Sequence, residues 1–360
     1  MAIELWTQAT SDRAGAAATS AIQAEQEGWN GVTFSDTQCL RLDVYVALAL
    51  AARATSSINI GTFVTNPWTR HPAVTASAIA SIQMESLGRT ELGIGRGDSS
   101  LAYLGLAPAP VGEFSSYVAI VQSYLRGESV PMDEVGSGGS LIGPSLPLGK
   151  RPETSRLEWL PDVQNLKKVP VWVTAAGPKV MQAGANLADR VILAVGADVE
   201  RIRLGIELVR SVNPTVAIGA FINVIAHDDA EEAYALAAKG IAGLARWSGM
   251  HGTSALPADP VQTEVFEAIG GQYDMTRHGD AQGNVAVVTP EFASRFGIIG
   301  PSSYCIERML SLAELGIDRF HVQQALPIGS QGLPELESAR RLSNETFLGA
   351  VADEVRNYGR

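Results

Sequence analysis

Cysteine is scarce in this sequence: Cys39 and Cys305 are the only two among 360 residues. Two widely separated cysteines do not make a disulfide framework, so we expect a reducing compartment and a cytoplasmic protein. The five histidines show no close pairing with one another or with a cysteine. A dedicated zinc site is therefore poorly supported, and we expect no metal.

Long apolar runs and an excess of basic residues are also missing. No stretch approaches the twenty apolar residues of a membrane span, and residues 1–6 lack the basic and apolar regions of a signal peptide. Acidic residues outnumber basic ones by 38 to 27, which gives a net charge of −11. Such a surface repels nucleic-acid backbones and anionic lipid, so we expect a small-molecule ligand, no nucleic acid and no membrane.

What the chain does contain is a regular alternation of short β-rich runs with longer helical stretches. We expect strands at 3–7, 31–35, 58–64, 91–95, 171–175, 191–195, 216–224 and 319–323. We expect helices at 11–27, 43–55, 71–87, 111–126, 178–188, 198–212, 229–244, 302–315 and 334–358, the first opened by Ser11 and Asp12 as caps. Such alternation implies parallel strands with right-handed crossovers. Eight units favour an α/β fold of the closed (β/α)8 TIM-barrel type, and an open doubly wound sheet is the alternative.

Two segments interrupt this alternation, near 127–169 and 248–290. The first is rich in glycine, proline and serine. Irregular segments of this length are usually functional or mobile. We interpret both as insertions into a single barrel domain that spans residues 1–360, because no linker separates two independent halves.

Small and polar residues follow several of the expected strands. They are found at 35–38, 65–67, 96–98 and 175–179. In a barrel the ligand site lies at the carboxyl ends of the strands, so these segments suit a planar ligand that forms hydrogen bonds. The run from Gly93 to Asp98 is not a dinucleotide fingerprint, because Asp98 stands where the third glycine belongs. It predicts either close approach of a cofactor ring to the glycine backbone or a tight turn that Asp98 caps.

Other residues carry two interpretations each. The junction around Gly177 opens a helix, which makes it a candidate site for a cofactor phosphate or a generic turn. Glu4 lies within the first strand and is either a proton carrier in the barrel interior or a paired structural carboxylate. His71 precedes Pro72 at the start of a helix, where histidine more often caps or packs than catalyses.

The segment from Thr65 to Ser77 resembles a signature of the bacterial-luciferase-like superfamily. It is most similar to the coenzyme F420-dependent branch that contains methylenetetrahydromethanopterin reductase. Supporting motifs follow in the expected order: Leu92–Asp98, Gly177–Lys179, Gly300–Pro301 and Leu315–Asp318. The resemblance implies a (β/α)8 barrel with insertions, usually a homodimer, and an oxidoreductase that transfers a hydride between F420 and an organic substrate.

The resemblance also implies site residues. It places a non-prolyl cis peptide between Phe63 and Val64, behind the cofactor ring. It assigns Glu4, Asp36 and Asp98 to catalysis. It assigns cofactor binding to Phe63, Val64, Thr65, Asn66, Gly95, Arg96, Gly97, Ala175, Ala176, Gly177, Pro178 and Lys179.

The chain departs from some relatives in that group. Residues 36–39 lack the histidine, and residues 195–197 the lysine, of the F420-dependent sugar-phosphate dehydrogenases, so glucose 6-phosphate is disfavoured. The alternative cofactor is FMN, in a monooxygenase that activates O2. A cofactor-binding barrel without turnover and a metal-free barrel hydrolase are the further alternatives.

Overall fold

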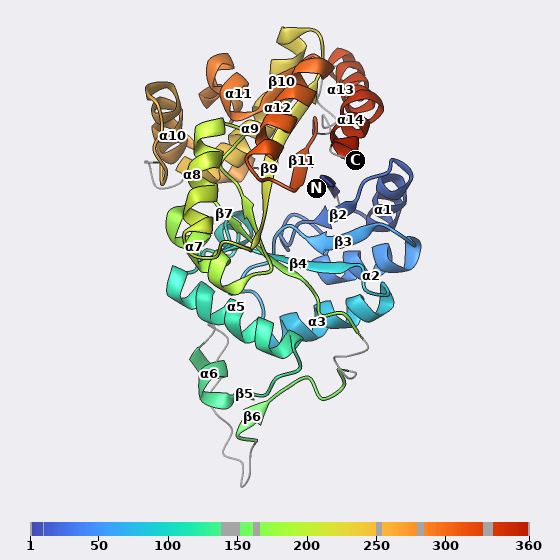
Figure 1. Ribbon diagram of the computed structural model, residues 1–360, viewed down its shortest axis with the longest axis vertical. Helices are drawn as coiled ribbons and strands as arrows, with labels where there is room; N and C mark the ends of the chain where they lie inside the picture. The colour runs from blue at the N-terminus through green and yellow to red at the C-terminus, as the bar shows by residue number, and fades with distance from the viewer. Residues whose placement is uncertain are drawn as a thin grey trace. The chain divides into compact units, whose positions relative to one another are not determined.

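Eight parallel strands alternate with helices along the chain. The structure is a computed structural model, which describes residues 2–9, 11–137, 152–160, 166–249, 254–278, 284–326 and 334–358 (Figure 1). The strands are β1 (Glu4–Ala9), β2 (Gly31–Phe34), β3 (Asn59–Thr62), β4 (Thr90–Ile94), β7 (Val171–Ala175), β8 (Arg190–Leu193), β9 (Ala217–Ala226) and β11 (Arg319–Gln323). The sheet order is β11-β1-β2-β3-β4-β7-β8, and β9 pairs with both β11 and β8. The predicted (β/α)8 barrel is therefore confirmed.

The helices that alternate with these strands also follow the predicted order. They are α1 (Ala16–Gln26), α2 (Val44–Ala54), α3 (Pro72–Glu85), α5 (Val111–Leu125), α7 (Pro178–Leu187), α8 (Val199–Arg210), α9 (Ala230–Gly249) and α12 (Ser302–Glu314). The C-terminal stretch forms α13 (Pro334–Thr346), a π-helical turn (Phe347–Val351) and α14 (Ala352–Asn357). A ninth strand that the sequence did not predict, β10 (Ile298–Gly300), pairs with β9.

The described chain divides into two compact units. One holds residues 1–8, 175–182 and 191–360, and the other holds residues 9–174 and 183–190. In the second unit α1, α2, α3 and α5 cover the strands β2, β3 and β4 (Figure 1). That the whole chain behaves as one domain stays a proposal.

Large and small residues interlock in the second unit. Trp172 on β7 is fully buried, and its ring lies against Gly61 on β3 and Gly93 on β4. A Cβ atom at Gly61 would stand 2.7 Å from the Trp172 ring. The two glycines in these strands therefore make room for one indole, in keeping with the close packing of protein interiors.

Capping residues fix where two of these helices begin. The Asp43 carboxylate accepts hydrogen bonds from the backbone N–H groups of Tyr45 and Val46 and caps α2. His71 Nδ1 accepts one from Ala73 and caps α3, as the structural interpretation of this histidine predicted. The predicted start of α1 at Ser11 is wrong, because the helix begins at Ala16, after Gly15 in the left-handed region at φ 78° and without a side-chain cap.

The two interrupting segments contain more regular structure than predicted. The first forms α6 (Met132–Ser137) and a short antiparallel pair, β5 (Val130–Pro131) with β6 (Thr154–Ser155). The second contains α10 (Pro260–Gln272), and α11 (Pro290–Phe296) begins at its end, so its prediction as irregular is wrong over those residues. Asp259 caps α10 and Pro260 opens it. Residues 138–151, 161–165, 250–253 and 279–283 lie outside the described residues.

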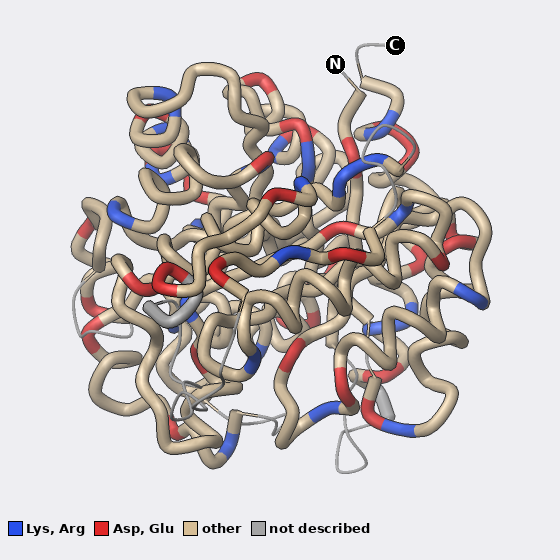
Figure 2. The backbone as a smooth tube through the Cα atoms, turned by 90° about the horizontal axis from the view of Figure 1, so that it is seen from below, with Lys and Arg blue, Asp and Glu red and all other residues tan. Residues whose placement is uncertain are grey.

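Charge and hydropathy agree with the composition. Asp and Glu occur along the whole described backbone, interspersed with Lys and Arg (Figure 2). None of the helices within the described ranges is long and apolar enough to cross a membrane.

Candidate functional site

Three strand ends meet in the second unit and bring predicted site segments together. Thr65 forms a parallel bridge with Ile94 at the end of β4. The Thr65 N–H donates to the Gly93 carbonyl at 3.0 Å, and the Gly95 N–H donates to the Thr65 carbonyl at 3.0 Å. Asp36, just beyond β2, accepts a hydrogen bond from the Thr65 hydroxyl at 2.7 Å. The predicted convergence of residues after β2, β3 and β4 is thus present.

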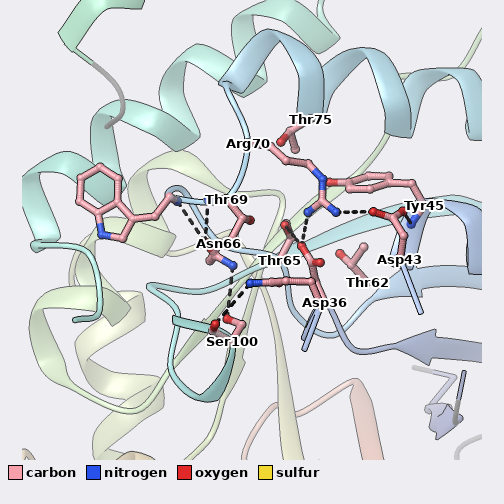
Figure 3. A network of polar contacts seen from close by, with 12 residues as sticks. Asp36, Asp43, Tyr45, Thr62, Thr65, Asn66, Thr69, Arg70, Thr75 and Ser100 are labelled. Atoms are coloured by element: carbon pink, nitrogen blue, oxygen red, sulfur yellow. Dashed lines mark hydrogen bonds and ion pairs between the residues drawn. The ribbon is translucent and has the colours of Figure 1, made fainter. Parts of the chain in front are cut away.

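Asp36 is the buried carboxyl of this site. Its side chain is 1% exposed and forms an ion pair with Arg70 at 2.6 Å (Figure 3). Burial raises the pKa of the Asp36 carboxyl, while the Arg70 charge and the hydrogen bonds from Thr65 and Arg70 lower it, and burial prevails. A carboxyl held in this way can keep a fixed orientation toward a ligand and responds strongly to the charges around it.

Asn66 organises the turn that follows β3. Its side-chain oxygen accepts hydrogen bonds from the backbone N–H groups of Trp68, at 3.0 Å, and Thr69, at 3.2 Å. Its amide nitrogen donates to the Ser100 hydroxyl at 3.4 Å, and the Gln38 amide donates to the Ser100 carbonyl at 3.3 Å (Figure 3). Ser100, which accepts from both Asn66 and Gln38, therefore ties the segments after β2, β3 and β4 together.

Side chains approach the glycine backbone closely beside this turn. Gly97 has φ +90°, and a Cβ atom there would collide with the Leu101 side chain and stand 3.3 Å from the Asn66 Cβ. A Cβ atom at Gly95 would stand 3.0 Å from the Val64 side chain. The Phe63–Val64 peptide bond is cis, as the resemblance implied. Glycine is required at position 97 both by its backbone conformation and by this contact.

The polar atoms of this site suit a planar, hydrogen-bonding ligand. Gln38 Oε1 and Thr69 Oγ1 are buried without a hydrogen-bond partner among the described residues. Together with the Asp36 carboxyl they offer acceptors and a donor on the segments that follow β2 and β3. Buried polar atoms usually have partners, so unsatisfied ones in one cluster indicate where a polar ligand fits.

The segment around Arg96 and Asp98 differs in part from expectation. Arg96 Nε donates to the Ala109 carbonyl at 2.5 Å, which fixes the guanidinium toward the start of α5. Asp98 precedes the four-residue helix α4 (Ser99–Ala102) but forms no side-chain cap, so the capping alternative for Asp98 is wrong. A catalytic role for Asp98 stays a prediction.

Glu4 lies in the first unit and is committed to a pair. Its carboxylate accepts from Arg319 Nε at 2.6 Å and from the Trp6 indole N–H at 3.2 Å. The Arg319 guanidinium stacks over the Trp6 ring, 4.4 Å from its centroid. The structure thus favours the paired, structural interpretation of Glu4, and any proton transfer by Glu4 would have to break this ion pair.

The predicted phosphate segment also lies in the first unit. Ala175 ends β7, and Pro178 opens α7 after Ala176 and Gly177. The Gly177 carbonyl accepts from the N–H groups of Val180 and Met181, and Lys179 is exposed. The strand-to-helix junction is confirmed, whereas its role in phosphate binding stays a prediction.

Arg70 is the site residue that sequence reasoning missed. It lies inside the Thr65–Ser77 motif, directly before the capping His71, and that position is the only sequence signal for it. Its guanidinium reaches Asp36 and Asp43, which are 34 and 27 residues away along the chain. Contacts over such separations are set by the tertiary fold and cannot be read from local spacing.

Comparison with known proteins agrees with this architecture. The family model described as luciferase-like monooxygenase matches residues 2–319. The chain is 27% identical over 336 residues to a 5,10-methylenetetrahydromethanopterin reductase of Methanolobus tindarius, covering 91% of this chain and 93% of that protein.

Two solved structures resemble the chain over nearly its whole length. One is the coenzyme F420-dependent tetrahydromethanopterin reductase of Methanopyrus kandleri, with a TM-score of 0.70, 19% identity and coverage of 99% and 100%. The other is an F420-dependent secondary alcohol dehydrogenase in complex with an F420–acetone adduct, with a TM-score of 0.67, 18% identity and the same coverage. At these identities the structures establish the fold alone. The family match over residues 2–319 goes further, and the chain belongs to the luciferase-like monooxygenase family of enzymes.

Proposed function

We propose that this protein is a coenzyme F420-dependent oxidoreductase that transfers a hydride between the deazaflavin and a small organic substrate. The observation that carries the proposal is the similarity over nine-tenths of the chain to a methylenetetrahydromethanopterin reductase, joined by two structural neighbours whose names include F420. We further propose a cytoplasmic homodimer.

Each unit offers its own candidate residues for cofactor binding. Asp36, Thr65 and Asn66 would bind the ring edge, with Phe63, Val64 and the backbone of residues 95–97 beside it. Residues 175–179 would bind the phosphate at the start of α7. The bound deazaflavin supplies a carbon that donates or accepts a hydride. The protein contributes orientation, because a fixed carboxyl and a rigid turn hold the reacting partners close.

The accompanying proton needs a carboxyl that can change its protonation state. Asp36 is buried and hydrogen-bonded, and Asp98 follows the glycine segment, so both lie on the strand-end segments of one unit. Glu4 remains a third candidate. Its pair with Arg319 makes it the least suited of the three, because accepting a proton would cost that ion pair.

An FMN-dependent monooxygenase is the second candidate function. The description of the matching family model as a monooxygenase favours it. A ring with the same planar shape would use the same strand-end segments. Oxygen consumption with reduced FMN would distinguish this function.

Fluorescence titration of the purified protein with F420 and with FMN tests the proposal. We expect F420 to bind at least about tenfold more tightly than FMN, which corresponds to about 1.4 kcal/mol. Asp36→Asn should weaken F420 binding, whereas Asp353→Asn on α14 should not. Tighter binding of FMN, with oxygen uptake, would move the protein to the monooxygenase function, and no binding of either cofactor would refute both.

A further inference from the structure

Arg70 lies between two carboxylates of very different exposure. Its Nη1 donates to Asp36 Oδ2 at 2.6 Å and its Nη2 to Asp43 Oδ2 at 2.7 Å (Figure 3). The side chains of Asp36, Arg70 and Asp43 are 1%, 16% and 48% exposed, respectively. The arginine therefore links a buried carboxyl at the site to a half-exposed one at the start of α2.

Other elements hold Arg70 in this position. Its guanidinium carbon lies 4.7 Å from the centroid of the Tyr45 ring on α2. The Tyr117 hydroxyl on α5 donates to the Arg70 carbonyl at 2.9 Å and lies 2.6 Å from the Thr75 hydroxyl on α3. Contacts from α2, α3 and α5 thus fix both the backbone and the charged end of this arginine.

This arrangement directs the Asp36 carboxyl. Arg70 and Thr65 both donate to Oδ2 of Asp36. Among the described residues, none forms a hydrogen bond with the second carboxyl oxygen, Oδ1. One oxygen is therefore fixed by the protein, and the other stays available to a ligand at the strand ends. A planar guanidinium imposes a defined direction on the carboxylate it binds, which a lysine cannot do as well.

We propose that Arg70 is a positioning residue, which fixes the orientation of the Asp36 carboxyl toward the cofactor ring and whose charge opposes the effect of burial on that carboxyl. The proposal rests on the proposed function for what Asp36 contacts. The link between Arg70 and Asp36 itself is a property of the ligand-free protein and can be measured without a cofactor.

Four titratable or charged groups face Asp36 from the elements around it. Arg70 lowers the pKa of Asp36 and Asp43 raises it, both through charge. Tyr45 and Tyr117 stay neutral over the range of interest, because burial raises the pKa of both phenols. Removal of Arg70 and removal of the Asp43 charge should therefore shift the Asp36 titration in opposite directions, although each breaks the same Arg70–Asp43 contact.

The test follows the Asp36 carboxyl by carbon-13 NMR in full-length, ligand-free protein labelled at aspartate, with Asp36→Asn to assign the signal. In Arg70→Met we expect the Asp36 midpoint to rise by about one unit or more. In Asp43→Asn, which keeps a good helix cap, it should fall slightly or stay unchanged. An unchanged midpoint in Arg70→Met, or a rise in both variants, would overturn the proposal.

A second variant, Arg70→Lys, tests the proposal even if Arg70→Met does not fold. Arg70→Lys keeps the charge but not the fork, so its Asp36 midpoint should stay within about half a unit of the wild-type value. F420 titration between pH 5 and 8 should still show weaker binding by this variant, because the carboxyl is less well oriented. Wild-type binding by Arg70→Lys would show that the fork is not needed. Failure of the wild type to bind F420 would contradict the proposed function and leave the NMR result standing.

Discussion

At the scale of single residues, Glu4 and Arg319 form an ion pair, and we expect it to contribute to stability because the arginine is buried. The Arg319 side chain is 5% exposed and that of Glu4 is 37% exposed. The two residues stand opposite each other in the register of β1 and β11. Trp6, in the same strand as Glu4, adds an indole donor to the carboxylate and a ring beneath the guanidinium. A buried cation held in this way is stabilised by its carboxylate partner.

Removal of the carboxylate should therefore destabilise the protein more than a change on its surface would. We expect Glu4→Gln to lower the free energy of unfolding by about 1–3 kcal/mol, because it removes the charged Glu4 acceptor from a buried guanidinium. Combining it with Arg319→Met should cost less than the sum of the two single changes. Denaturant unfolding of the three variants measures this. Strict additivity would show that the pair is not coupled.

Sequence reasoning placed single residues well where a motif fixed them, and poorly where their partners are distant. Thr65 and Asn66 stand beside the segment that contains Gly95 and Gly97, as the motif order indicated. The sequence did not predict that Asp36 pairs with Arg70, or that Glu4 pairs with Arg319. An arginine has a long, flexible side chain, and its partner is decided only when the elements pack together.

At the scale of elements, one carboxylate ties α1 to the turn between α2 and β3. Glu25 Oε1 accepts from the backbone N–H groups of Ser56, Ser57 and Ile58 at 2.9, 2.6 and 3.0 Å, and from the Ser57 hydroxyl at 2.8 Å. Burial acts to raise the pKa of Glu25, but these hydrogen bonds prevail and lower it to about 2. The turn is thus held by a charged acceptor.

This contact should make stability depend on pH in a defined window. Because the folded pKa is about 2 and the ordinary value 4.5, the stabilisation is complete above pH 4.5 and is lost as the pH falls toward 2. Glu25→Gln should lower the melting temperature at pH 6, and the gap between variant and wild type should narrow by pH 3. Glu27→Gln, which keeps Glu25, is the control. A gap that is constant with pH would contradict this account.

Elements with strong periodicity followed the prediction, and those that depend on local caps did not. Strands β7 and β11 have the predicted bounds. The start of α1 was misplaced because residues 11–15 form a non-helical loop, which ends at Gly15 in the left-handed region. Helix α10 was missed although Asp259 followed by Pro260 is typical of a helix start, because the surrounding segment was interpreted as irregular.

At the scale of the whole molecule, the first unit is assembled from three separate stretches of chain. It combines residues 1–8, 175–182 and 191–360. Strand β1 supplies the partner for one edge of β11, from Glu4 opposite Arg319 to Thr7 opposite Val322, while β9 covers the other edge. The N-terminal strand is therefore an internal part of a unit built mostly from the C-terminal half. This interleaving argues for one folding domain, although the alternation of strands and helices alone could not reveal it.

A fragment of residues 175–360 should accordingly fail to fold by itself. Without β1, the backbone groups along one edge of β11 lose their partners, and Arg319 loses the carboxylate of Glu4. We expect no cooperative thermal transition by circular dichroism. The same fragment joined through a flexible linker to residues 1–9 should regain protection of the β11 amides in hydrogen exchange, because the missing strand is restored. If the bare fragment melts cooperatively at the same temperature as the linked one, β1 is dispensable and the C-terminal half is an independent domain.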